Sequence, residues 1–167
     1  MRGSATLEGD GEQTEGGEGR MTRRTGPWDA AKVDAHLADT VIPLRLACAS
    51  ASGHPRVVSL WYLWRDGALW CATSPQARVV AWLAREPRCG FEVARDVPPY
   101  QGVRGRGRAA LDPVRGGEIL AALVVRYLGT CETPFARWLL ARADDEMAIR
   151  IEPETLASWD FSLRMGG

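Results

Sequence analysis

The sequence predicts one mainly β domain with helices, in which about six strands form a small antiparallel barrel. With 167 residues the chain is long enough for a single domain with its own core. Six runs rich in β-branched and aromatic residues mostly follow one another directly, as antiparallel neighbours do. Between these runs, helical patterns come only after the third and the fifth, so the regular βαβ alternation of a doubly wound sheet is missing.

The strongest local signal is a hairpin formed by residues 57–64 and 68–73. Asp66-Gly67 stands between these two runs, and Asp-Gly favours the tight turn that joins antiparallel strands. The first run, VVSLWYLW, is apolar at both alternating sets of positions. Such a strand needs a partner on each face, so we expect the barrel interior on one side and a helix or a second subunit on the other.

Turn and helix-end signals divide the remainder of the chain into elements. Pro-containing starts such as Thr133-Pro134, and stops such as Gly129 or Glu86-Pro87, bound the helices, and short apolar runs mark the strands. We expect further strands at 41–50, 89–94, 103–111 and 147–152, and helices at 27–38, 75–85, 113–128 and 134–142, with a tail that includes Leu156, Trp159 and Phe161.

Residues 1–24 consist mostly of Gly, Glu, Thr and Arg and contain almost nothing to bury. We therefore expect a disordered N-terminal segment, 1–24, followed by a single domain, 25–167. Met21 is an alternative start of the chain, so whether residues 1–20 belong to the natural protein is left open.

The composition excludes several function classes. Lys+Arg and Asp+Glu both total 21, so no overall field favours nucleic acid or an acidic substrate. The four Cys form no Cys-x-x-Cys pair and only two His could assist them, so we expect no metal site. No metal-ligand pattern surrounds the acidic run 144–146, which includes Glu146, and we expect it in a solvated turn. No signal peptide and no apolar run of membrane-spanning length is evident. We expect a cytoplasmic protein with a small-molecule substrate and without a membrane partner.

A candidate anion site follows the second hairpin strand. Ser74 is suited to the N-cap of the next helix and Pro75 to its first position. Free N–H groups and the positive end of the helix dipole attract anions there. Because helical side chains lean toward the N-terminus, Arg78 can reach the same anion. The sequence thus predicts a phosphate site on the rim of the barrel.

Residues 103–111 alternate small and basic side chains. Glycine on one face indicates close approach by a ligand or backbone, or room for bulky Trp side chains opposite. Arg104, Arg106 and Arg108 share the other face, which could bind phosphates or acidic partners or simply face solvent. A nucleic-acid surface is the weakest of these readings, and we expect no nucleic-acid partner.

An ordered series of motifs over residues 41–160 carries a resemblance to a known family. The pieces are Gly53-His54-Pro55, the strand 57–64, Asp66-Gly67, the strand 68–73 ending in Thr73, Arg78, Glu86-Pro87-Arg88, the Gly-x-Ala strand 103–109, and 149–153 followed by Trp159. In this order and spacing they resemble the pyridoxamine 5'-phosphate oxidase-like flavin-binding proteins. The resemblance implies a six-stranded antiparallel split β-barrel flanked by helices.

The resemblance also implies a homodimer with FMN in clefts between the subunits. Thr73 and Arg78 would grip the FMN phosphate, residues 58–62 would lie along the isoalloxazine ring, and residues 100–104 would approach from the partner subunit. The candidate cofactor-binding residues are Val58, Ser59, Leu60, Trp61, Tyr62, Thr73, Ser74, Arg78, Tyr100, Gln101, Arg104 and Trp159. The oxidase's Ser and Lys beside Arg78 and its C-terminal Arg-x-His motif are absent, which argues against true pyridoxamine phosphate oxidase activity.

We therefore expect a flavin-dependent oxidoreductase of unknown substrate. The chain shows no Ser-His-Asp set and no Cys nucleophile with a His partner, so catalytic residues cannot be named and the cofactor would carry the chemistry. One alternative is a reductase of the same fold that uses coenzyme F420. Another is a non-catalytic flavin- or haem-binding carrier or sensor, in which His36 or His54 would ligate the haem.

Overall fold

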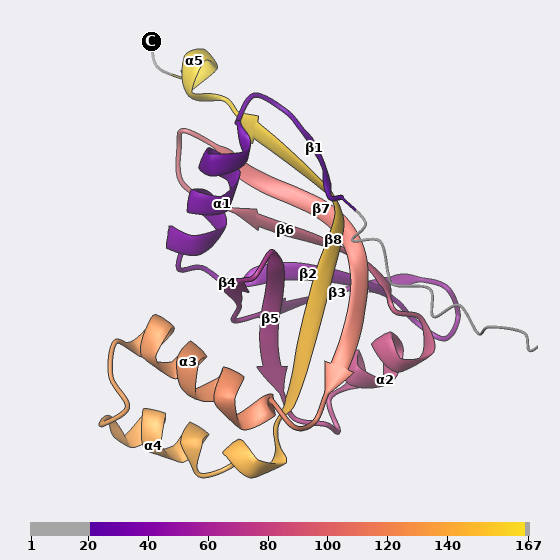
Figure 1. Cartoon of the computed structure of the whole chain (residues 1–167), viewed down its shortest axis with the longest axis vertical. Coiled ribbons are helices and arrows are strands. Elements are labelled where there is room, and N and C mark those ends of the chain that lie inside the picture. The colour runs from indigo at the N-terminus through magenta and orange to yellow at the C-terminus, as the bar shows by residue number, and fades with distance from the viewer. Residues whose placement is uncertain (1–20, 166–167) are drawn as a thin grey trace, which may run out of the picture.

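A computed structural model describes residues 21–165, which form one strongly curled eight-stranded sheet with helices at its two ends (Figure 1). The strand order is β3-β2-β6-β7-β8-β5-β4, and β1 pairs with β8 from the side. The elements are β1 (Arg23–Thr25), α1 (Ala30–Asp39), β2 (Leu44–Ala49), β3 (Pro55–Leu60), β4 (Leu63–Arg65), β5 (Ala68–Thr73), α2 (Arg78–Arg85), β6 (Arg88–Ala94), β7 (Gln101–Asp112), α3 (Gly116–Leu128), α4 (Pro134–Leu140), the 3₁₀ turn η1 (Ala143–Asp145), β8 (Met147–Asp160) and α5 (Ser162–Met165).

The prediction of a mainly β, antiparallel split barrel with flanking helices is confirmed, but the expected six strands are eight. One additional strand arises because the apolar run 57–64 is interrupted and forms β3 and β4. The other is β1, which pairs in parallel with β8 and includes Arg23 and Arg24, both expected in the terminal segment. The remaining part of that expectation, residues 1–20, lies outside the described residues.

The interruption at Trp61 and Tyr62 creates the split in the barrel. β3 pairs only with β2 and β4 only with β5, so the chain crosses from one edge of the sheet to the other at these two residues. The Tyr62 side chain is fully buried, and its hydroxyl donates to the carbonyls of Leu37 (2.8 Å) and Thr40 (3.0 Å). We call the crossing at Trp61-Tyr62 the seam. The sequence does not reveal the seam, because apolar residues continue through Trp61 and Tyr62.

The predicted hairpin turn is confirmed beyond the seam. Asp66 and Gly67 both have positive φ, 52° and 70°, as a two-residue type I′ turn requires. The turn places Leu63 opposite Trp70 and Arg65 opposite Ala68. It therefore determines the register of β5, which runs from this turn to Thr73.

The longest pairing joins β7 and β8, both of which extend beyond their predicted ends. β8 continues past Pro153, where a strand was expected to stop, because the register shifts there and no ladder hydrogen bond from proline is needed. The glycines of β7 do face inward. A side chain at Gly105 would collide with the Thr155 carbonyl and the Phe91 ring, so close backbone packing and a phenylalanine explain the glycine, rather than a tryptophan.

Two helical layers cover different ends of this ribbon (Figure 1). α1 lies beside the upper half and contributes Val33 and Leu37 to the barrel core. α3 packs Ile119 and Leu123 onto Trp70 of β5, and α4 packs on α3. Arg126 of α3 donates to the carbonyls of Ala38 and Thr40, so it satisfies the C-terminal end of α1.

The predicted helix ends are only partly right. Thr133 caps α4 by accepting from the Ala136 N–H, and Gly129 ends α3 with φ 73°, both as expected. α2, however, begins at Arg78 rather than at Pro75, and α3 at Gly116 rather than at Pro113. In both places a polar side chain closes a short turn before the helix, which delays its start. Within residues 21–165 no helix is long and apolar enough to cross a membrane.

Candidate functional site

A cavity of about 390 Å³ lies beside the seam, and we call it the seam pocket. It is lined by Ser59, Leu60, Trp61, Ala72, Thr73, Ser74, Leu120, Leu123, Phe135, Leu139, Arg142 and Glu146. The edge strand β3 and the end of β5 form one side, and α3, α4 and the turn after η1 form the other. The structure thus brings together Ser59, Leu60, Trp61, Thr73 and Ser74, all of which were predicted to bind a cofactor.

Trp61 is held in a defined orientation in this pocket. Its indole stacks on the Tyr127 ring, with centroids 4.7 Å apart and planes 6° from parallel. The Tyr127 hydroxyl donates to the Ile42 carbonyl at 2.8 Å and accepts from the Tyr62 N–H at 3.2 Å. The pocket wall is therefore rigid where a planar ligand would contact it.

The two ionisable groups of the seam pocket were missed by sequence reasoning. Glu146 was expected in a solvated turn but is only 9% exposed, and burial raises the pKa of its carboxyl, which nearby Arg142 partly offsets. Arg142 was expected merely to end a helix, yet it lines the cavity and its guanidinium lies 4.0 Å from the Trp138 ring centroid. The glycine pair Gly116-Gly117 could have indicated that the start of α3 packs closely on another segment. Gly116 lies against the Glu146 backbone and Gly117 against Ala143.

Ser74 does not cap α2, so this part of the phosphate-site prediction is wrong. Its hydroxyl accepts from the Gln76 N–H at 3.2 Å and donates to the Gln76 side-chain oxygen at 2.5 Å. Ala77 occupies the N-cap position and offers no side-chain hydrogen bond. The local turn therefore uses the hydroxyl that we expected to serve the helix end.

Arg78 faces a different cavity from Thr73. This second cavity, of about 340 Å³, is lined by Ser50, Ala51, Ser52, Arg56, Arg78 and Trp82, and we call it the turn pocket. Arg78 is the first residue of α2 and is exposed. Its role in gripping a phosphate together with Thr73 stays a prediction that ligand binding must test.

Val58 and Tyr62 also lie away from the seam pocket. Val58 is half-buried and packs against the barrel core, and Tyr62 is wholly inside it. Burial of Tyr62 raises the pKa of its phenol well above its usual range. Neither side chain lines the cavity, so within one chain the contact surface of β3 consists of Ser59 and Leu60, with Trp61 beyond the strand end.

Tyr100, Gln101, Arg104 and Trp159 gather at the opposite end of the β7–β8 ribbon. Gln101 pairs with Asp160, and the Arg104 guanidinium lies 5.5 Å from the Trp159 ring centroid. Thr73 pairs with Met147 at the other end of β8. At about 3.3 Å per residue, roughly 40 Å of strand separates the two groups. One chain therefore does not bring all the predicted residues together.

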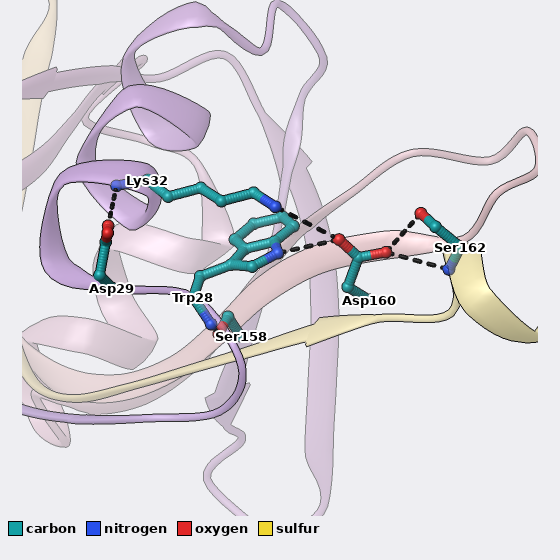
Figure 2. Close-up of polar contacts among 6 residues, drawn as sticks. All are labelled: Trp28, Asp29, Lys32, Ser158, Asp160 and Ser162. Atoms are coloured by element: carbon teal, nitrogen blue, oxygen red, sulfur yellow. Dashed lines mark hydrogen bonds and ion pairs between the residues drawn. The ribbon is translucent and has the colours of Figure 1, made fainter.

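A polar cluster fixes this upper end, as Figure 2 shows. Asp160 accepts from the Trp28 indole N–H at 3.0 Å, from Lys32 Nζ at 3.4 Å, and from both the N–H and the hydroxyl of Ser162. These donors, the Ser162 hydroxyl first among them, hold the pKa of Asp160 well below its usual range. The cluster ties α1 and α5 to the end of β8, which is a structural role.

The β7 arginines alternate with acids on neighbouring strands. Arg104 pairs across with Glu92 of β6, and Arg108 with Glu152 of β8. All three β7 arginines are exposed, which agrees with the reading that their face lies toward solvent. Opposite charges at facing positions make this outer surface mixed rather than uniformly basic.

Cysteine and histidine side chains offer little chemistry here. Cys48, Cys71 and Cys89 are buried, and burial raises their thiol pKa values, to about 11 for Cys48 and about 12 for Cys89. The two ring nitrogens of His36 lie 3.1 Å from the Val93 carbonyl and 3.4 Å from the Thr40 hydroxyl. Among residues 21–165 no group of three or more His, Cys, Asp or Glu could hold a metal ion.

Solved structures share this fold. No family model and no curated protein sequence matches the chain. The conserved hypothetical protein Rv2991 of Mycobacterium tuberculosis is 22% identical, with a TM-score of 0.71 over 88% of this chain and 93% of the other. An F420 reductase is 21% identical, with a TM-score of 0.62 over 73% and 94% of the two chains.

A third match is a protein from Listeria innocua described as a candidate pyridoxamine 5'-phosphate oxidase. It is 16% identical, with a TM-score of 0.59 over 77% of this chain and 95% of the other. At these identities the similarity concerns the fold. The chain has the split β-barrel fold of the pyridoxamine 5'-phosphate oxidase-like proteins, as the order of motifs in the sequence predicted.

Proposed function

We propose that this protein is a flavin-dependent oxidoreductase that binds FMN in the seam pocket. The observation that carries the proposal is the meeting of Ser59, Leu60 and Trp61 with Thr73 in one cavity on a split-barrel fold. Its volume of about 390 Å³ lies within the usual range of small-molecule sites. Similarity to an F420 reductase and to a candidate pyridoxamine 5'-phosphate oxidase supports a flavin-type ligand.

The residues present fit a planar cofactor with a polar tail. β3 is an edge strand, so the backbone groups on its outer side are available to the polar edge of a flavin ring. Trp61 supplies a fixed aromatic wall, and Leu120 and Leu123 of α3 exclude water from the back of the cavity. Thr73 offers a hydroxyl for a phosphate. Bound flavin would supply hydride or electron transfer, while the chain binds and orients it.

A homodimer is part of the proposal, because the upper group of Tyr100, Gln101, Arg104 and Trp159 could reach the pocket only from a second copy. The strand β3 supports this arrangement, since Val57 is 65% exposed on an edge strand. In a two-fold dimer each chain would complete the other's site. A monomer by light scattering at micromolar concentration would contradict the shared site.

Coenzyme F420 is the second candidate cofactor, and the similarity to an F420 reductase favours it. The haem alternative has less support, because a carbonyl and a hydroxyl flank the ring nitrogens of His36 and His54 lies in an exposed turn. A non-catalytic flavin carrier shares all the geometry of the enzyme and differs only in turnover.

The test is the absorption spectrum of the purified protein, followed by titration with FMN and with F420. We expect saturable binding of one of them, followed by reduction of the bound FMN by NADH or NADPH. Binding without reduction by any added donor would favour the carrier, and a Soret band would favour haem. Failure to bind either cofactor would refute the proposal.

A further inference from the structure

We infer that Arg142 is the anion anchor of the seam pocket, holding the phosphate or carboxylate of a planar aromatic ligand at the pocket mouth. The inference deepens the proposed function, on which it rests for the identity of the cofactor. Nothing in the order of motifs pointed to Arg142, since it follows α4, a helix outside the series of motifs that carries the family resemblance.

Among residues 21–165, Arg142 is the only basic residue that lines the pocket. Within residues 21–165 its guanidinium forms no hydrogen bond or ion pair, and it lies 4.0 Å from the Trp138 ring centroid. The aromatic face restrains the flat guanidinium while leaving its N–H donors free. A cation that is held in place and has unused donors can bind a phosphate or carboxylate through two parallel hydrogen bonds.

α4 adds an aromatic ledge beside this arginine. Phe135 and Trp138 are 52% and 56% exposed, unusually high for such large rings, and they stack with centroids 5.9 Å apart. Phe135 also lines the pocket. A ligand with its acid group on Arg142 would place a planar ring between Trp61 and this ledge, which is why the geometry points to an aromatic ligand rather than an aliphatic one.

Glu146, the one acid in the described part of the chain that lines the pocket, does not pair with Arg142. No ion pair within 4.0 Å joins the two side chains, and Glu146 is 9% exposed. Burial raises the pKa of its carboxyl, and Arg142 partly offsets that shift. The N–H donors of Arg142 are therefore not occupied by Glu146 and stay available to an incoming anion.

The alternative anchor, Arg78, lies in the turn pocket, which shares no lining residue with the seam pocket. Thr73, the hydroxyl predicted to bind phosphate beside Arg78, lines the seam pocket with Arg142 instead. The two arginines therefore correspond to two different phosphate positions. Arg142 would hold the phosphate in the seam pocket, and Arg78 would hold it in the turn pocket.

The first arm of the test compares FMN with riboflavin, which lacks the phosphate. Arg142→Ala should weaken FMN binding by about ten- to a hundredfold and leave riboflavin unchanged, while Arg142→Lys should recover part of the loss. Arg137→Ala is the matched control, since Arg137 is an exposed arginine of α4 that pairs with Glu132 at 3.8 Å outside the pocket. Arg78→Ala is measured alongside and should weaken FMN binding less than Arg142→Ala does.

The second arm asks whether the anion belongs to a substrate, and it needs no flavin. Binding of benzoate and of uncharged benzamide is measured on the purified protein and on Arg142→Ala. A loss confined to benzoate assigns Arg142 to a substrate acid, and a loss confined to FMN assigns it to the cofactor phosphate. The inference is overturned if Arg142→Ala weakens neither FMN relative to riboflavin nor benzoate relative to benzamide. It is also overturned if FMN binding is weakened only in Arg78→Ala. If the wild type binds neither FMN nor F420, the proposed function fails while the benzoate arm still decides the anchor.

Discussion

The seam pocket and the turn pocket are similar in volume but differ in what surrounds their arginines. The seam pocket is walled by apolar side chains from α3 and α4 and by the stacked Trp61, and it contains one arginine held by an aromatic ring. The turn pocket has two arginines, Arg56 and Arg78, and its lining includes the exposed turn residues Ala51 and Ser52. The number of arginines thus favours the turn pocket, whereas enclosure and aromatic support favour the seam pocket.

The difference teaches that proximity along the chain is a poor guide to which arginine serves a site. Thr73 and Arg78 are neighbours in sequence, but β5 ends and α2 begins in directions that send them to different cavities. Arg142 is far from Thr73 in sequence and lines the same cavity, because β8 returns beside β5 and carries the turn after η1 with it.

The largest expected effect concerns the seam itself. Tyr62→Ala removes a fully buried ring and should destabilise the protein by about 3–5 kcal/mol, measured by urea denaturation. Tyr62→Phe should cost less, about 1–3 kcal/mol, because only the donor to the Leu37 and Thr40 carbonyls is lost. Trp82→Ala, a half-buried change in the turn pocket, is the control. If Tyr62→Ala lowered the free energy of unfolding no more than Trp82→Ala, the buried Tyr62 side chain would not be what fixes the seam.

A smaller effect should separate the aromatic neighbours of the two arginines. Trp138→Ala removes the ring that restrains Arg142, worth about 0.5–1 kcal/mol, and should weaken FMN binding about two- to fivefold. Trp82→Ala alters the lining of the turn pocket and should leave FMN affinity unchanged. Fluorescence titration measures both. The reverse result would identify the turn pocket as the phosphate site.

Local sequence chemistry predicted much of the fold. Asp66-Gly67 specified the hairpin turn, Thr133 and Gly129 marked helix ends, and the alternation in β7 separated an inner glycine face from an outer arginine face. These signals act through φ values and side-chain caps of a few neighbouring residues. They therefore depend little on contacts with distant residues.

The seam and the pocket depended on contacts between distant residues. The run 57–64 looks continuous, and only the buried hydrogen bonds of Tyr62 to α1 reveal why it must break. Glu146 resembled a solvated acid because nothing in its local sequence shows that α3, through Gly116, packs against its backbone. In the sequence, only the glycine pair Gly116-Gly117 at the start of α3 indicates this close packing.

The smallest expected effect tests the charge balance of the seam pocket through Glu146→Gln. Burial raises the pKa of the Glu146 carboxyl above its unfolded value, and Arg142 only partly opposes the shift. The folded state therefore favours the protonated acid. The associated stability is fully present below the unfolded pKa, about 4.3, and is lost as pH rises through the folded pKa.

Glutamine cannot ionise, so Glu146→Gln should unfold at the same temperature as the wild type near pH 4 and at a higher temperature at pH 8. Asp145→Asn, which removes an exposed acid from the adjacent turn, is the matched control and should show no such gain. Removing the Glu146 charge should also tighten FMN at pH 8, opposite in sign to Arg142→Ala, because an anion on Arg142 is repelled by a nearby carboxylate. Weaker FMN binding in Glu146→Gln would show instead that the carboxylate orients Arg142, and thermal unfolding with FMN titration at both pH values distinguishes the two.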